Sequence, residues 1–277
     1  TGVDASKLSY QFAGLNHFHW HRVFDEKGNE VTEQIINRIN DKESGLPKNI
    51  FSADLPLELL HSTKVIPCAY HRYYYCEKEM LNHSIEEFKK EGTRAEQVKE
   101  VEESLFKLYI NKDLTIKPEE LSKRGGAYYS DAACECISAI YNNKGIHMVV
   151  STQNNGAIPC LDSDSIVEVS SIISSRGAEP IAWGEMSSFE KGYIQIMKAM
   201  EECTIKAALT GDYGTALEAF SINPLVQHGN EARIVLNELL VAHEKYLPQF
   251  KNKIEELKKE GVHSTDSVVI DLMMNGY

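Results

Sequence analysis

Long apolar runs, paired cysteines and an excess of positive charge are all missing from this sequence of 277 residues. No apolar stretch approaches the length of a membrane-spanning helix, and no signal-peptide pattern opens the chain. The six cysteines include no CxxC pair, which is typical of reduced thiols inside a cell. The net charge of −12 argues against nucleic acid as a partner, because phosphates demand a basic surface. We therefore expect a cytoplasmic protein that binds neither nucleic acid nor a membrane.

The common phosphate-binding and nucleophile motifs are also missing. Neither GxGxxG nor GxxxxGK[ST] occurs, so the sequence has no recognisable glycine-rich loop for a nucleotide. No GxSxG sequence marks a serine nucleophile either. The chemistry of the chain must therefore be sought in other polar clusters.

The spacing of apolar residues predicts a mixed fold that is mostly helical. Alternating and apolar stretches predict strands near residues 8–24, 146–152 and 166–173. From Ser187 onward the spacing is helical. No internal repeat or convincing linker interrupts the chain, so we expect one α+β domain over residues 1–277.

The stretch GLNHFHWHRVF, residues 14 to 24, contains three histidines at alternate positions, His17, His19 and His21. In a strand these side chains would share one face, and three imidazoles match the ligand count of a catalytic zinc site. A half-exposed strand with hydrogen-bonded histidines explains the same pattern without a metal. No glutamate in an HExxH spacing accompanies them, which weakens the zinc interpretation.

Three further segments combine polar groups that suit a substrate. RGGAYYSDAA places a glycine pair and Arg124 at the start of a predicted helix, where free backbone N–H groups can bind an anion. PCAYHRYYY sets Arg72 among aromatic residues, a mixture that suits sugar phosphates. STQNNGAIP concentrates the amides of Gln153, Asn154 and Asn155 in one loop. Tight turns, packed tyrosines and amides that cap the backbone explain the same segments structurally.

The chain resembles the carboxyl-terminal domain of glycoside hydrolase family 4 in six segments, which follow one another in the family's order. They are GLNHFHWHRVF, PCAYHRYYY, KRGGAYYSDAAC, STQNNGAI, GDYGTALEAFSINPLV and AHEKYLPQF. The similarity runs from Leu15 to about Phe250 and is closest to the 6-phospho-β-glucosidases. It implies an α+β fold of the lactate and malate dehydrogenase carboxyl-terminal type, mostly helical with a small sheet. It also implies that residues 1–277 form the substrate- and metal-binding domain, without the NAD-binding Rossmann domain.

The resemblance further implies hydrolysis of 6-phospho-β-glucosides with NAD and a divalent metal, usually manganese. This family is an exception to the two-carboxylate rule for glycosidases. Hydride leaves carbon 3 of the sugar, a base removes the proton of carbon 2, and the aglycone leaves carbon 1. Water then adds and the hydride returns. The metal lies on the oxygens of carbons 2 and 3, where it stabilises negative charge.

Two residues of this chain match the family's central roles. The resemblance implies that His17 is a metal ligand and that Tyr129 is the catalytic base, with Tyr128 turned into packing. His19 and His21 match no ligand in the family pattern. The candidate substrate-binding residues are Asn16, Arg72, Arg124, Asn154 and Asn155.

The chain departs from the family pattern in its metal site. The family's second metal ligand is a cysteine in a Cys-Asn-x-Pro stretch before the GLNH motif, and no such stretch occurs here. We therefore expect a substrate domain separated from its Rossmann domain near Thr1 and inactive by itself. The expected parent enzyme acts on a phosphorylated disaccharide or aryl glucoside.

Three alternatives remain open at this point. They are a 6-phospho-α-glucosidase, a catalytically silent module that binds sugar phosphate, and a zinc hydrolase built on the three histidines. Self-association into a homo-oligomer is also expected, as in the family, because a separated domain exposes a natural contact surface.

Overall fold

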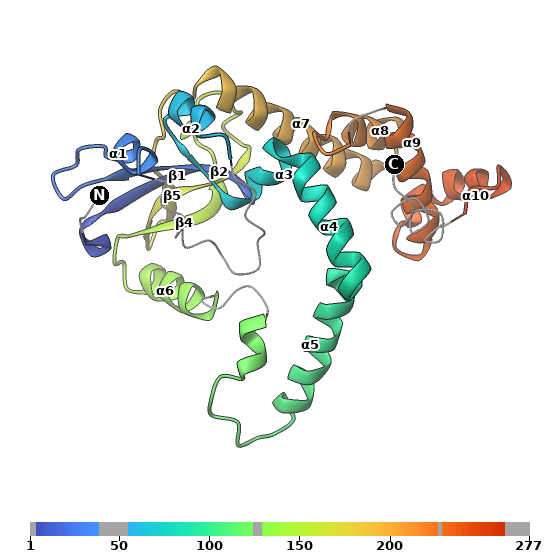
Figure 1. Ribbon diagram of the computed structural model, residues 1–277, viewed down its shortest axis with the longest axis horizontal. Helices are drawn as coiled ribbons and strands as arrows, with labels where there is room; N and C mark the ends of the chain where they lie inside the picture. The colour runs from blue at the N-terminus through green and yellow to red at the C-terminus, as the bar shows by residue number, and fades with distance from the viewer. Residues whose placement is uncertain (1–3, 39–54, 124–128, 227–228, 264–277) are drawn as a thin grey trace. The chain divides into compact units, whose positions relative to one another are not determined.

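The computed structural model describes residues 4–38, 55–123, 129–226 and 229–263. The chain divides into two compact units, Thr1–Gly184 and Glu185–Tyr277 (Figure 1). The first unit contains a β-sheet with helices, and the described part of the second contains helices alone.

An antiparallel sheet forms the centre of the first unit. Its strands are β1 (Ser9–Leu15), β2 (Phe18–Phe24), β3 (Ile66–Pro67), β4 (Ile146–Gln153), β5 (Ile166–Ser174) and β6 (Gly177–Pro180). The strand order is β3-β2-β1-β5-β4, and β6 pairs with the carboxyl-terminal half of β5. Ala13 of β1 and Val150 of β4 both pair with Val169 of β5. This pairing places β5 in the interior of the sheet.

The composition of β5 explains its interior position. Its sequence IVEVSSIIS is rich in β-branched residues, which suit a pleated strand, and most of its side chains are buried. Val167 and Val169 contribute to the core together with Phe18 and Trp20 of β2. The strands predicted near 146–152 and 166–173 are confirmed, and the one predicted over 8–24 is a hairpin of two strands.

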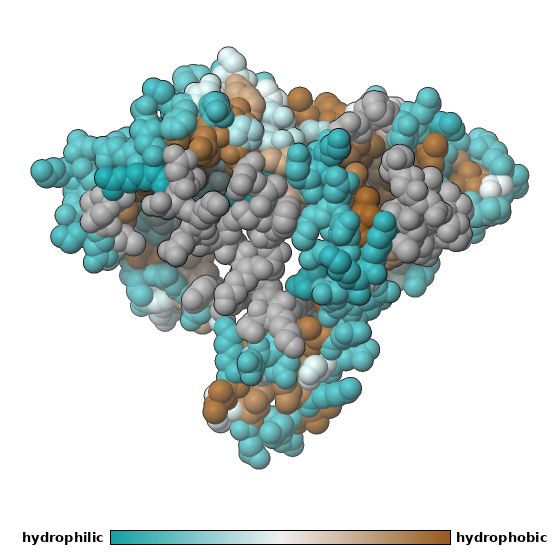
Figure 2. Space-filling view, viewed as in Figure 1, coloured by the Kyte–Doolittle hydropathy of each residue, from teal (hydrophilic) through white to brown (hydrophobic). Residues whose placement is uncertain are grey.

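The helices of the first unit lie in the segments that connect the strands. They are α1 (Thr32–Ile36), α2 (Leu57–Thr63), α3 (Arg72–Tyr75), α4 (Glu77–Glu91), α5 (Arg94–Tyr109) and α6 (Tyr129–Tyr141), with 3-10 turns η1 (Ala5–Lys7), η2 (Ala69–His71) and η3 (Glu119–Lys123). A capping box starts α5, because Thr93 and Glu96 each accept a hydrogen bond from the other's backbone N–H. Figure 2 shows a hydrophilic surface over α4, whereas Phe106, Tyr109 and Ile110 are exposed near the end of α5.

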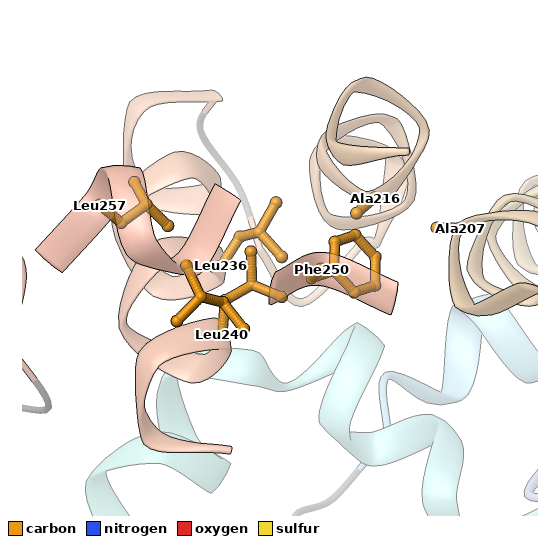
Figure 3. Close-up of a cluster of buried hydrophobic side chains, with 7 residues drawn as sticks. Ala207, Ala216, Leu236, Leu240, Phe250 and Leu257 are labelled. Carbon is orange, nitrogen blue, oxygen red and sulfur yellow. The ribbon is translucent and has the colours of Figure 1, made fainter. Parts of the chain in front are cut away.

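The second unit buries an apolar cluster between its helices. They are α7 (Ser188–Thr210), α8 (Tyr213–Ile222), α9 (Gly229–Ala242), η4 (Glu244–Tyr246), η5 (Pro248–Phe250) and α10 (Lys251–Lys259). The cluster consists of Ala207, Ala216, Leu236, Leu240, Phe250, Ile254 and Leu257 (Figure 3). Gly211 ends α7 with φ of 71°, and a Cβ there would lie 2.1 Å from the carbonyl oxygen of Gln249. Only glycine therefore fits where α7 meets η5.

The predicted α+β class, mostly helical with a small sheet, is confirmed. In the part of the chain that the structure describes, no helix is long and apolar enough to span a bilayer.

Candidate functional site

The β1–β2 hairpin places His17 in a tight turn. Leu15 pairs with Phe18, so Asn16 and His17 alone connect the two strands. Both turn residues are exposed, and His17 has a left-handed backbone with φ of 62°. His17 therefore lies outside the strand and does not share a strand face with His19 and His21.

His19 and His21 lie in β2 and pack against the core. The His19 ring stacks on Phe12 at 3.8 Å between centroids and lies 4.9 Å from the His21 ring. Its Nδ1 lies 3.4 Å from the Leu15 carbonyl oxygen and 3.6 Å from a carboxylate oxygen of Glu168. Burial and the neighbouring His21 lower the pKa of His19 to about 3, and burial also lowers the pKa of His21. Both rings are therefore neutral parts of the sheet at neutral pH.

The described residues do not assemble a three-histidine metal centre. Within them, no group of three or more histidine, cysteine, aspartate or glutamate side chains is arranged to hold a metal ion. The zinc hydrolase alternative thus has no site in the described part of the chain.

Glu168 lies close to the turn on the neighbouring strand. It pairs with Gly14 of β1 and Ser151 of β4. Burial raises the pKa of its carboxyl group, while a hydrogen bond from the Asn16 side chain and the nearby His17 act in the opposite direction. The Glu168 carboxylate therefore connects Asn16 to β5 through this hydrogen bond, and it places negative charge near His17.

The segment around η2, from Cys68 to Arg72, also contacts the turn. The Cys68 amide donates to the His19 carbonyl at 3.0 Å, and its thiol donates to the His17 carbonyl at 3.2 Å. The Tyr70 ring then stacks on the His17 imidazole, with 3.9 Å between centroids and 22° between planes. Arg72 follows at the start of α3, half-buried, where its guanidinium donates to the Ala69 carbonyl at 3.3 Å.

Tyr129 lies in the same unit, at the start of α6. It is the first residue of that helix, with 78% of its surface exposed. Burial raises the pKa of the Tyr70 phenol, and the charges of Cys68 and then Tyr129 add to this effect. Tyr129 therefore lies within electrostatic reach of the residue that stacks on His17. Arg124 and Tyr128, two further residues of the sequence prediction, lie outside the described residues.

The amides of the STQNNGAIP loop have different environments. Asn154 is fully buried, and its side chain donates to the carbonyls of Ile158, Leu161 and Asp162 and accepts from the Ile158 amide. This network uses its polar atoms within the loop, which corrects the prediction that Asn154 contacts substrate. Asn155 is exposed, with a left-handed φ of 47°.

The turn offers part of a donor set that suits manganese. Imidazole nitrogen and carboxylate or carbonyl oxygen are common ligands of divalent first-row metals. Among the described residues, nothing forms a hydrogen bond with the ring nitrogens of His17, and Glu168 places a carboxylate nearby. The residues fit a cation to this extent, and its other ligands would have to come from outside the described set. No residue can be assigned to NAD, because the sequence has no glycine-rich nucleotide loop.

Sequence reasoning missed two residues of this region. Tyr70 was treated as one of several packed tyrosines, and Glu168 was not considered. Glu168 is the single charged residue of β5, in a strand that is otherwise apolar or serine. This single charge was the available signal, because a carboxylate among apolar strand residues loses water contact and needs a partner.

A family comparison settles the relationship of the chain to known proteins. Residues 12–226 match the family 4 glycosyl hydrolase C-terminal domain. The chain belongs to this family. The matched range contains the turn at Asn16 and His17, η2 and the start of α6.

Curated members of the family share much of the sequence. The chain is 48% identical over 254 residues to a probable 6-phospho-beta-glucosidase of Bacillus subtilis, covering 91% of this chain and 58% of the relative. It is 37% identical over 261 residues to the 6-phospho-beta-glucosidase of Escherichia coli, covering 92% and 58%. A 6-phospho-alpha-glucosidase of Leptotrichia buccalis is 24% identical over 265 residues, covering 90% and 58%. The chain thus spans less than two thirds of the length of these relatives.

Solved structures of a family 4 enzyme have the same fold. The 6-phospho-beta glucosidase of Thermotoga maritima with NAD and glucose-6-phosphate superposes with a TM-score of 0.75 at 30% identity, over 89% of this chain and 57% of that one. A structure of the same enzyme with manganese, NAD+ and glucose-6-phosphate has a TM-score of 0.74 at 30% identity, covering 88% and 56%. The predicted lactate and malate dehydrogenase carboxyl-terminal type of fold is confirmed.

Proposed function

We propose that the protein containing this chain hydrolyses 6-phospho-β-glucosides with the help of NAD and a divalent cation, manganese in particular. The observation that carries the proposal is 48% identity, over 91% of the chain, to a relative named as a probable 6-phospho-beta-glucosidase. Residues 1–277 would serve as its substrate- and metal-binding domain. The substrate would be a phosphorylated disaccharide or an aryl glucoside.

The described residues suggest how the chain would contribute. NAD would supply removal and return of the carbon 3 hydride, and the cation would polarise the oxygens of carbons 2 and 3. His17 would hold the cation through a ring nitrogen, since its imidazole is exposed at the turn. The Tyr129 oxygen would take the proton of carbon 2 as the bond between carbon 1 and the aglycone breaks.

The arrangement of the turn and α6 supports these roles. With His17 holding the cation and Tyr129 acting as the base, both residues would have to face one sugar ring. The stacking of Tyr70 on His17, and the effect of Tyr129 on the pKa of the Tyr70 phenol, support a shared location for the three residues. Asn16, Arg72 and Asn155 remain candidates for contacts with the sugar or its phosphate, as does Arg124 from the sequence alone.

A 6-phospho-α-glucosidase is the second candidate. Its support is that a relative with this name aligns over 90% of the chain, although at 24% identity. Identity is higher to the relatives named for β-glucosides, at 48% and 37%. We therefore place the β-glucoside first.

The test uses the whole protein with NAD, Mn²⁺ and the two anomers of p-nitrophenyl glucoside 6-phosphate. Faster release from the β anomer is expected, and faster release from the α anomer would reverse the order of the candidates. His17→Ala is expected to abolish Mn²⁺ dependence together with turnover. Tyr129→Phe is expected to lower kcat and to slow exchange of the carbon 2 proton with deuterated solvent, while NAD and Mn²⁺ still bind. Undiminished exchange in Tyr129→Phe would remove Tyr129 as the base.

We also propose that the 277-residue chain binds sugar phosphate without turning it over. The reason is chemical, because the redox steps require NAD and the chain has no recognisable nucleotide loop. Release of p-nitrophenol by the chain with NAD and Mn²⁺, abolished by Tyr129→Phe, would contradict this.

A further inference from the structure

We propose that Tyr70 is a positioning residue of this site, whose ring holds the His17 imidazole in a fixed plane. The proposal rests on the metal-binding role assigned to His17 under the proposed function. It adds a residue for which sequence reasoning gave no role.

His17 needs such a support because its own position restrains it little. It is the second residue of a two-residue turn, is exposed, and has a left-handed backbone. No described residue forms a hydrogen bond with its ring nitrogens. Such nitrogens are available to a cation, but an exposed side chain samples several rotamers and loses that freedom on binding.

The stacking geometry supplies the missing restraint. With 3.9 Å between centroids and 22° between planes, one face of the imidazole is covered by the Tyr70 ring. The ring nitrogens lie in the imidazole plane, so a covered face leaves them accessible at the ring edge. The contact can therefore fix the plane of the ligand without competing for its lone pair.

Tyr70 is itself well anchored, on both sides of its position in the sequence. Cys68 donates two hydrogen bonds to the hairpin, one to the His17 carbonyl and one to the His19 carbonyl. His71 is fully buried, with its ring 4.3 Å from that of Phe18. The backbone of Tyr70 is thus held between two contacts with the same hairpin that presents His17.

The contact that carries the proposal is made by the Tyr70 ring. The ring and the hydroxyl of Tyr70 can therefore be tested separately.

The first experiment needs no metal. In protein labelled with ¹³C-histidine, the His17 ring signals are assigned by their loss in His17→Ala. Ring-current theory predicts that they are displaced upfield in the parent and in Tyr70→Phe, which keeps the ring. In Tyr70→Leu they should move to the position of an unstacked histidine. Unchanged His17 signals in Tyr70→Leu would overturn the proposal.

The second experiment measures Mn²⁺ binding by the disappearance of the free-ion electron paramagnetic resonance signal. Tyr70→Phe should bind as the parent does, whereas Tyr70→Leu should bind about 2- to 10-fold more weakly, the range expected for one aromatic pair. The matched control is Tyr10→Leu, which removes an exposed tyrosine whose ring also contacts a histidine, His147, at 5.4 Å between centroids. Equal affinity in Tyr70→Leu and the parent would overturn the proposal, as would equal weakening in Tyr10→Leu.

The two experiments separate this proposal from the proposed function. If His17→Ala binds Mn²⁺ as tightly as the parent, His17 is not a metal ligand, and the proposal that Tyr70 positions a metal ligand is also overturned. If His17→Ala loses binding and Tyr70→Leu does not, the function stands and Tyr70 alone is overturned.

Discussion

His71 illustrates how a single buried side chain can contribute to the response of the hairpin region to acid. None of its surface is exposed, and neither ring nitrogen has a hydrogen-bond partner among the described residues. Its ring lies against those of Phe18, Trp20 and Tyr75. Burial is the main cause that lowers its pKa from 6.5 to about 3, with smaller effects from His19 and His21. The folded protein therefore keeps His71 neutral.

Acid should destabilise the first unit partly through His71. Between pH 6.5 and about 3, the unfolded chain binds a proton at this residue and the folded chain does not. Its contribution to stability is thus complete above pH 6.5 and is lost as the pH falls, by at most about 1.4 kcal/mol per pH unit. Urea unfolding of His71→Phe at several pH values should show a shallower loss than the parent. Tryptophan fluorescence is the readout, because Trp20 and Trp183 both lie in this unit.

The control for this measurement is His61→Asn, since His61 is exposed on α2. That variant should keep the pH dependence of the parent. Identical slopes for His71→Phe and the parent would show that His71 does not carry the effect. The comparison of slopes remains valid even if the larger phenylalanine ring changes stability at neutral pH.

At the scale of the elements, the β1–β2 hairpin depends on a close approach at Gly14. Gly14 pairs with His19, and a Cβ on it would lie 2.4 Å from both the His19 Cα and the Phe18 carbonyl oxygen. These are backbone atoms, so relief requires movement of β2 itself. The position is therefore closed to any other residue unless the hairpin shifts.

Gly14→Ala should consequently destabilise the first unit by about 2–5 kcal/mol, the sum of overpacking and a positive-φ penalty. Gly28→Ala is the control, because Gly28 has φ of 78° but nothing within 4 Å of the added Cβ. It should cost only about 1–2 kcal/mol. The free energies of unfolding come from urea titrations followed by tryptophan fluorescence. If the two variants lose the same unfolding free energy, β2 can move away from the added Cβ at no cost in stability.

The hairpin also shows why part of the site could be predicted from sequence and part could not. The alternating pattern over 8–24 correctly predicted extended structure, but neither turn position, Asn16 or His17, is a glycine or a proline that would mark a turn. His17 and Tyr129 were singled out because contiguous motifs contain them.

Tyr70 and Glu168 join the same region only through long-range contacts. The first comes from η2 and the second from β5, which pairs with β1 across about half of the chain. A sequence pattern carries local information, so neither the stacking on His17 nor the hydrogen bond from Asn16 was accessible. Asn154 shows the opposite case. Its amide-rich loop suggested a ligand contact from the sequence, but the Asn154 side chain hydrogen-bonds the backbone of its own loop.

At the scale of the whole molecule, the family match ends inside the second compact unit. The match stops at residue 226, shortly after α8. The buried cluster of the second unit draws on both sides of that limit. Ala207 and Ala216 lie before it, and Leu236, Leu240, Phe250, Ile254 and Leu257 lie after it. Helices α7 and α8 would therefore lose most of this cluster if the chain ended at the limit of the match.

We expect the whole chain to self-associate. Its net charge predicts how this self-association depends on salt concentration. Copies with a net charge of −12 repel one another, and salt shortens the range of that repulsion from ~10 Å at 0.1 M to ~3 Å at 1 M. Large apolar side chains such as Ile110, Ile116 and Leu209 are about 79% exposed, and their association is not screened. Light scattering should therefore give a mass above one 31.2 kDa chain that rises with salt. A single-chain mass at both salt concentrations would contradict self-association, and a mass that falls with salt would indicate contacts made by ion pairs instead.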